Sequence, residues 1–129
     1  LHKLDIGVDI GKVADVKPIY FDLNSDEIKK EASSELDKVV KAMQDNPNII
    51  IELGSHTDAR GDDAYNMDLS EKRAKSSASY IISKGISKAR VKAKGYGESQ
   101  LVNDCGNDVE CSEEEHTQNR RTEFKIIKF

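Results

Sequence analysis

Two long segments of the chain repeat apolar residues at the spacing of an α-helix. The pattern predicts a first helix over residues 26–45, with Ser25 as its N-cap and Pro47 enforcing its end. It predicts a second helix over residues 63–84, with Gly85 just past the end, where glycine is favoured. The inward-facing positions are Ile28, Ala32, Leu36, Val39, Val40 and Met43 in the first helix, and Met67, Ala74, Ala78 and Ile81 in the second.

Shorter apolar stretches outside these segments are typical of β-strands. Residues 48–53, NIIIEL, are rich in β-branched residues and apolar on both faces, which predicts a central strand flanked by helices. Residues 19–22 predict a short strand before the first helix. Residues 91–94 alternate as a strand does, and the chain is then expected to turn at Gly95 and Gly97.

The C-terminal part adds a short predicted helix over residues 113–118 and a final strand in RRTEFKIIKF. The order βαβαββ predicts an α+β fold, an α/β two-layer sandwich in which helices cover one face of a mixed sheet. Residues 1–17 form an N-terminal extension. Apolar residues alternate over residues 6–10 as in an added strand, although two glycines weaken that prediction.

Length and composition indicate one globular domain: 129 residues, of which 36% are hydrophobic, are enough to build a core. A net charge of −4 argues against nucleic acid or an anionic membrane as the main partner. No apolar stretch approaches membrane-spanning length, which argues against direct membrane insertion by this segment. Because the chain begins with Leu1 and not with Met, we expect a processed form or an excised domain, with any export signal or anchor outside it.

The two cysteines, Cys105 and Cys111, lie in a polar, acidic stretch with five residues between them. This spacing suits a disulfide that staples one loop, and a disulfide indicates an oxidising compartment. Free thiols are one alternative. A metal site that also uses His116 is another, although a zinc site would need further ligands from elsewhere in the chain.

The polar segment GSHTDARG, directly after the predicted central strand, collects the residue types that catalysis or ligand binding uses. Ser55, His56 and Asp58 contain the residue types of a hydrolytic triad, but neighbours on an extended chain point in opposite directions. A metal site would need a second ligand at helical or hairpin spacing from His56, and none is present. We therefore expect no catalytic residue, metal or cofactor, and a His56 that ties the loop together by hydrogen bonds.

Recognition of a charged ligand is the better interpretation of this loop. Asn66, Leu69 and Arg73 share one face of the second predicted helix, because they are three and seven positions apart. If the loop folds over this helix, Asp58 and Arg73 flank one pocket, whose opposite charges suit a ligand end with both an ammonium and a carboxylate. An ordinary Asp58–Arg73 salt bridge explains the same spacing equally well.

The segment HTDARGDDAYNMDLSEKRAKSSASYIISKGI resembles the signature of the OmpA-like peptidoglycan-binding domain. This family includes peptidoglycan-associated lipoproteins and the C-terminal domains of flagellar stator proteins. IYFDLNS resembles the family's opening strand, KGYGES its glycine turn and NRRTEF its closing strand. The resemblance covers residues 18–129. Its second-helix motif is matched by Tyr65, Asn66, Leu69, Ser70, Arg73 and Ala74.

This resemblance implies binding of the peptide stem of peptidoglycan through diaminopimelate. By the family pattern, Asp58 would contact the ligand's ammonium and Arg73 its distal carboxylate. Backbone N–H groups near Ala59 and Leu69 would contribute to the pocket. Its other residues would be Phe21, Asp22, Thr57 and Asn66.

Two features depart from the commonest family pattern, and the role of a third, the pair of arginines in the closing strand, is open. The loop that holds the two cysteines is an insertion found in only part of the family. Arg60 adds a cation beside Asp58, and it is expected to pair with Asp62 or Asp63, or else to contact another carboxylate of the stem. Arg120 and Arg121 are expected to form salt bridges with the acidic residues 113–115, and one of the two to face the ligand loop.

The sequence thus predicts a non-enzymatic module of the periplasm that binds peptidoglycan. It would tether an outer-membrane protein or lipoprotein of a Gram-negative-type bacterium to the cell wall. The rival hypothesis is a structural or protein-interaction module of the same fold that does not bind peptidoglycan. The presence of both Asp58 and Arg73 argues against the rival.

Overall fold

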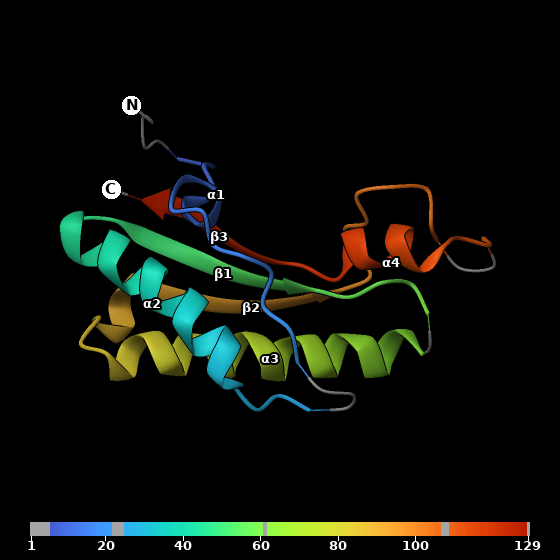
Figure 1. Ribbon diagram of the computed structural model, residues 1–129, viewed down its shortest axis with the longest axis horizontal. Helices are drawn as coiled ribbons and strands as arrows, with labels where there is room; N and C mark the ends of the chain where they lie inside the picture. Colours follow the sequence, from blue (N-terminus) through green and yellow to red (C-terminus); the bar gives the residue numbers. More distant parts are fainter. Residues whose placement is uncertain (1–5, 22–24, 61, 107–108, 129) are drawn as a thin grey trace.

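The computed structural model describes residues 6–21, 25–60, 62–106 and 109–128 (Figure 1). Within them, a mixed three-stranded sheet has the order β2-β1-β3, with β2 parallel and β3 antiparallel to the central strand. The predicted α+β arrangement and the central position of the NIIIEL strand are confirmed. The elements are α1 (Ile10–Val13), α2 (Lys30–Asp45), β1 (Ile50–His56), α3 (Asp63–Ser83), η1 (Lys88–Arg90), β2 (Val91–Gly97), α4 (Glu113–Asn119) and β3 (Thr122–Lys128).

The core lies between the sheet and the two long helices, which cover one of its faces (Figure 1). Each of its central side chains is at most 1% exposed. On β1, alternate residues point into this core, whereas Ile50 and Glu52 on the other face are only half-buried. The two faces of the central strand are therefore covered unequally. The central side chains are Leu36, Val39 and Met43 of α2, Ile51 and Leu53 of β1, and Phe124 and Ile126 of β3.

The predicted strand at residues 19–22 and the predicted start of the first helix were wrong. Residues 19–21 are not in a strand, and Asp22 lies outside the described residues. Pro18 has no N–H to donate to a ladder, and Ile19 is held by burial of its side chain. The helix begins at Lys30. The carbonyl of Ser25 accepts a hydrogen bond from Arg73 Nε (2.9 Å), so this carbonyl does not take part in a first helical turn after Ser25.

The strand predicted in the N-terminal extension forms only in part. Asp9 makes a bridge with Lys125 of β3, the N–H of Gly7 donates to the carbonyl of Ile126 (2.8 Å), and the N–H of Ile126 donates to the carbonyl of Val8 (2.9 Å). The chain then enters the short helix α1, because the Asp9 carboxylate accepts hydrogen bonds from the N–H groups of Gly11 (2.9 Å) and Phe124 (3.0 Å). A cap that also bonds to β3 thus ends the extended segment.

The glycines expected to form a turn lie within β2, which continues to Gly97. A Cβ on Gly95 would lie 2.3 Å from the backbone nitrogen of Glu71, so glycine allows α3 to pack directly on this strand. Gly97 has φ +54°, and its N–H donates to Ser70 Oγ of α3 (2.9 Å). Both glycines therefore set how closely α3 approaches the sheet. Gly85 follows the cap of α3 with φ +101°, as predicted.

Candidate ligand-binding site

The loop after β1 is buried at the end of the sheet. Thr57, Asp58 and Ala59 are each less than 10% exposed. The N–H of His56 donates to the carbonyl of Arg121 (2.8 Å), and that of Thr57 donates to the carbonyl of Gly97 (2.8 Å). The ends of β2 and β3 therefore hold the loop in place.

His56 is the last residue of β1, and its side chain contacts β2 and β3; the hydrogen bonds by which it was expected to tie the loop together are not seen among the described residues. Its ring stacks on Tyr96 with a centroid separation of 4.8 Å, and its Nε2 lies 3.1 Å from a carboxylate oxygen of Glu123. Burial and the nearby Arg121 lower the pKa of His56 to about 4, so the ring is neutral at neutral pH. It faces Glu123 and not Asp58, so His56 and Asp58 do not pair as the histidine and aspartate of a hydrolytic triad do.

Asp58 is the buried anion of the site. Its Oδ1 accepts from the N–H of Arg60 (2.9 Å), and its Oδ2 accepts from Arg60 Nη2 (2.8 Å) and Arg120 Nη1 (2.7 Å). Burial raises the pKa of this carboxyl, but the hydrogen bonds from the two arginines outweigh burial and hold the pKa below its ordinary value. Asp58 is therefore ionised at neutral pH.

Helix α3 supplies the opposite wall. Asn66 Nδ2 donates to the carbonyl of Arg60 (2.9 Å), which ties the loop to the first turn of the helix. Two turns later, the guanidinium of Arg73 lies 4.9 Å from the centroid of the Phe21 ring, while its Nε donates to the carbonyl of Ser25. Burial lowers the pKa of Arg73 from its very high ordinary value, and the group stays cationic.

These residues surround one pocket of about 460 Å³. Asp58 and Arg73 both line it, and the described ion pairs of Asp58 are with Arg60 and Arg120, so the alternative of an Asp58–Arg73 salt bridge does not hold. Of the predicted site residues, Ala59 is buried beside the pocket and Asp22 lies outside the described residues. The lining residues are Phe21, Thr57, Asp58, Arg60, Tyr65, Asn66, Leu69, Arg73, Glu113 and Arg120.

The favoured prediction for Arg60 was wrong. It pairs with Asp58 and with Glu113 Oε2 (2.8 Å), and not with Asp62 or Asp63. The carboxylate of Asp62 is used as the N-cap of α3, where it accepts from two backbone N–H groups. Glu113, which sequence reasoning placed only in a rim salt bridge, is part of the pocket wall.

Of the two neighbouring arginines, Arg120 is the one that faces the ligand loop. It bonds to Asp58 and, through Nη2, to Glu113 Oε1 (2.7 Å). Arg121 instead donates to the carbonyl of Gln100 (2.8 Å) and lies 3.4 Å from a carboxylate oxygen of Glu123. The expected salt bridge to residues 113–115 is thus made by Arg120.

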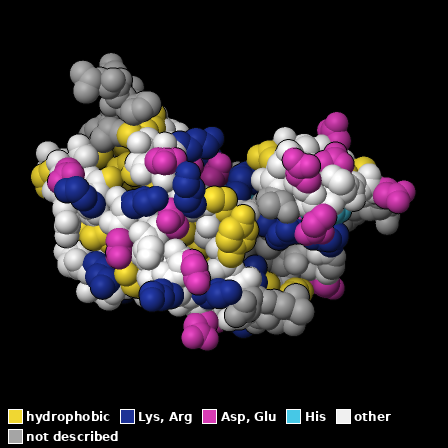
Figure 2. Space-filling model, viewed as in Figure 1, with side chains coloured by type: hydrophobic (Ala, Val, Ile, Leu, Met, Phe, Trp, Pro, Cys, Tyr) yellow, Lys and Arg dark blue, Asp and Glu magenta, His cyan; other side chains and the backbone are white. Residues whose placement is uncertain are grey.

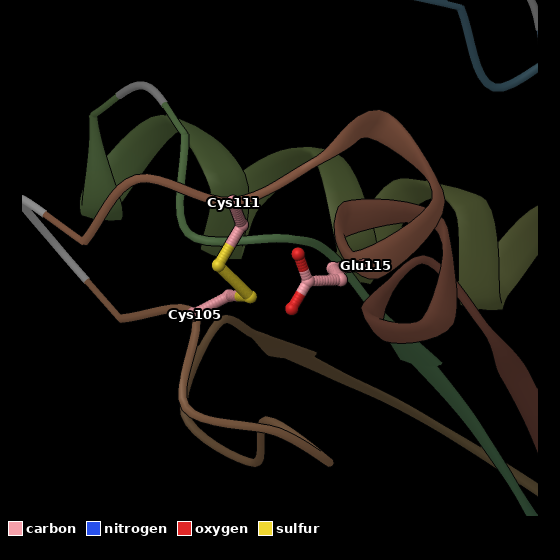
Figure 3. Close-up of side chains that lie close together, drawn as sticks. All are labelled: Cys105, Cys111 and Glu115. Carbon is pink, nitrogen blue, oxygen red and sulfur yellow. A yellow bond between two sulfur atoms is a disulfide. The ribbon is translucent and has the colours of Figure 1, made fainter.

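Cys105 and Cys111 form a disulfide, which was the first of the three possibilities (Figure 3). The carboxylate of Glu115 lies near the two sulfur atoms, but sulfurs bonded to each other are not thiolate ligands, so this group does not make a metal site. Glu115 instead accepts from the N–H of Ser112 (3.0 Å), whose Oγ accepts from the N–H of Glu115 (3.2 Å). This capping box starts α4.

No helix in the described part of the chain is long and apolar enough to span a membrane.

Comparison with known proteins identifies the family. The peptidoglycan-associated lipoprotein of Pseudomonas putida is 37% identical over 110 residues, which are 85% of this chain and 63% of that protein. Outer membrane protein A of Serratia marcescens is 38% identical over 93 residues, which are 68% of this chain and 26% of that protein. The chain therefore spans less than two thirds of the length of these relatives.

Solved structures share the fold. The peptidoglycan-associated lipoprotein from Burkholderia pseudomallei superposes with a TM-score of 0.72 at 24% identity, over 88% of this chain and 92% of that one. The cell wall anchor of the T6SS from Pseudomonas aeruginosa gives 0.71 at 22% identity, over 84% and 75%. At these identities the likeness shows the fold alone.

Residues 20–115 match the family model described as OmpA family, and together with the relatives this match shows that the chain belongs to the OmpA family.

Proposed function

We propose that this chain binds peptidoglycan without catalysis, through the diaminopimelate of the stem peptide, and so anchors an outer-membrane protein or lipoprotein to the cell wall from the periplasm. One observation carries the proposal: Asp58 from the β1 loop and Arg73 from α3, of opposite charge, line the same pocket. The relatives named peptidoglycan-associated lipoprotein and outer membrane protein A support the location and the polymer.

The free end of diaminopimelate carries an ammonium and a carboxylate on one carbon, so it needs an anion and a cation a few ångströms apart. In the proposed complex the ammonium donates to Asp58. A carboxylate offers about four acceptor positions, and three described hydrogen bonds reach Asp58. One position is thus left for a ligand donor.

The ligand carboxylate would bind Arg73, whose planar fork can donate two parallel hydrogen bonds. The Ser25 carbonyl and the Phe21 ring hold this guanidinium in place before any ligand arrives. Thr57, Asn66 and backbone N–H groups near Ala59 and Leu69 would complete the pocket, with Asp22 as a further polar contact. Binding to a prearranged side chain loses less rotamer entropy.

A single stem should bind with roughly micromolar to millimolar affinity, because the ligand end is small. A cell-wall polymer presents many stems, so several anchored copies of the domain would be retained more firmly than one site allows. This suits an anchor that must hold a membrane component near the wall.

Calorimetric titration with a diaminopimelate-containing stem tripeptide tests the proposal. Asp58→Ala and Arg73→Ala should each weaken binding at least about tenfold, because each removes a charge-assisted hydrogen bond. Asp68→Ala and Lys75→Ala are matched controls, since they remove the same charges from exposed positions of α3. A lysine-containing peptide lacks the distal carboxylate and should bind more weakly. If the folded wild type binds no stem peptide, the proposal fails and the interaction-module hypothesis takes its place.

A further inference from the structure

Two guanidinium groups at the edge of the pocket are held between two carboxylates. On the inner side, Asp58 Oδ2 bonds to both Arg60 and Arg120. On the outer side, Glu113 places Oε2 2.8 Å from Arg60 Nη1 and Oε1 2.7 Å from Arg120 Nη2. One carboxylate thus bridges two guanidinium groups through charge-assisted hydrogen bonds, which a ligand carboxylate could also form.

The two carboxylates differ in their surroundings. The Asp58 side chain is 9% exposed and belongs to the loop fixed by β2 and β3. The Glu113 side chain is 66% exposed and comes from the first turn of α4. In Figure 2, Lys and Arg side chains gather where the lobe that carries α4 meets the body of the domain, with acidic side chains against them. The outer carboxylate is therefore the one that solvent, or a ligand, can replace.

The disulfide loop delivers Glu113 to this position. Cys111 is bonded to Cys105, and the capping box of Ser112 and Glu115 fixes the first turn of α4 on either side of Glu113. The disulfide and the capping box therefore present a carboxylate of the protein to the two arginines at the rim of the pocket.

We propose that Arg60 and Arg120 form a second anion subsite, which takes another carboxylate of the stem peptide, and that Glu113 occupies this subsite until the ligand displaces it. The inference rests on the proposed function. A stem whose glutamate is linked through its side chain keeps an α-carboxylate next to the diaminopimelate, so it carries the required second anion. A stem with that group amidated does not, and would leave Glu113 in place. Glu113 is then a specificity-determining residue.

Exposed ion pairs are weak and easily exchanged, so displacement of Glu113 costs little but measurably lowers affinity. Removing its charge should therefore favour only the ligand that competes for the subsite. Glu113→Gln should tighten binding of the glutamate-containing tripeptide by about two- to fivefold and leave binding of the amidated tripeptide unchanged.

The experiment is a calorimetric titration of wild type, Glu113→Gln and Glu114→Gln with the two tripeptides, which differ only in carboxylate or carboxamide at the second residue. Glu114 is the matched control, since it is an exposed acid on the same turn. The wild type should prefer the carboxylate peptide, and Glu113→Gln alone should widen the preference. If the ratio of the affinities for the two peptides is the same in the wild type and in both variants, the second subsite is overturned and the proposed function stands. No binding of either peptide by the wild type would overturn both.

Discussion

The contact between α3 and β2 at Gly95 allows a sharp test of how this domain holds its site. A methyl group at Gly95 would lie 2.3 Å from the backbone nitrogen of Glu71 and 2.6 Å from Ser70 Oγ. The backbone nitrogen cannot rotate away as a side chain can, so α3 must move outward by about 1 Å to restore van der Waals distance. Gly95→Ala should therefore be destabilising although alanine is small.

The magnitude follows from two costs. Overpacking typically costs about 1–3 kcal/mol. An outward shift of α3 also stretches the buried hydrogen bond from the Gly97 N–H to Ser70 Oγ, which adds about 1–3 kcal/mol. We expect a loss of about 2–6 kcal/mol in the free energy of unfolding. A domain of this size has roughly 6–19 kcal/mol, so the variant should still fold.

Urea denaturation followed by circular dichroism, with the disulfide intact, measures the loss. Gly106→Ala is the control, since a Cβ there meets no described atom within 4 Å, and it should change stability by less than about 0.5 kcal/mol. Because α3 carries Asn66 and Arg73, Gly95→Ala should also weaken binding of the stem tripeptide. A Gly95→Ala protein as stable as Gly106→Ala would refute the reasoning.

Three further predictions concern the site and its surroundings. Arg73→Lys keeps the charge but loses the planar fork and the Nε bond to Ser25, so calorimetry should show about tenfold weaker tripeptide binding; unchanged affinity would mean that charge alone suffices. Burial and the neighbouring Asp63 raise the pKa of Glu98 in the folded protein from 4.5 to about 7. The contribution of this carboxyl to the free energy of unfolding is therefore fully present below pH 4.5, and it is lost as the pH rises through about 7. In urea titrations Glu98→Gln should match wild type at pH 4 and exceed it in stability at pH 8, and equal stability at pH 8 would contradict the shift. Replacing Cys105 and Cys111 together by serine should cost roughly 2 kcal/mol, as expected for a short closed loop, and an unchanged urea midpoint would show that the loop is braced by other contacts.

Local patterns predicted the long elements well. The second helix was expected over residues 63–84 and forms over Asp63–Ser83, with Gly85 just past its end. The first helix ends as predicted but starts late, because Arg73 holds the carbonyl of Ser25, 48 positions away in the sequence. Helix periodicity depends on neighbouring residues, whereas this start depends on a contact between distant ones.

In the candidate site, too, local spacing predicted which residues share a helix face but not which distant residues come into contact. The spacing of Asn66, Leu69 and Arg73 placed them correctly on one helix face, and all three line the pocket. For Arg60, pairing was expected with Asp62 or Asp63, but Asp62 is used as a helix cap. Arg60 pairs instead with Asp58 and with Glu113, which is 53 positions away.

The sequence by itself determined the fold class, the family and the residues that carry opposite charge into one pocket, because periodicity and motif spacing are properties of the chain. Only the tertiary structure decided which charges meet. The pairing of Asp58 with Arg120 spans 62 positions, and it exists because β3 pairs with β1 and so brings the residues just before β3 to the loop after β1. Ion pairs between distant segments depend on that packing geometry, which spacing along the chain does not contain.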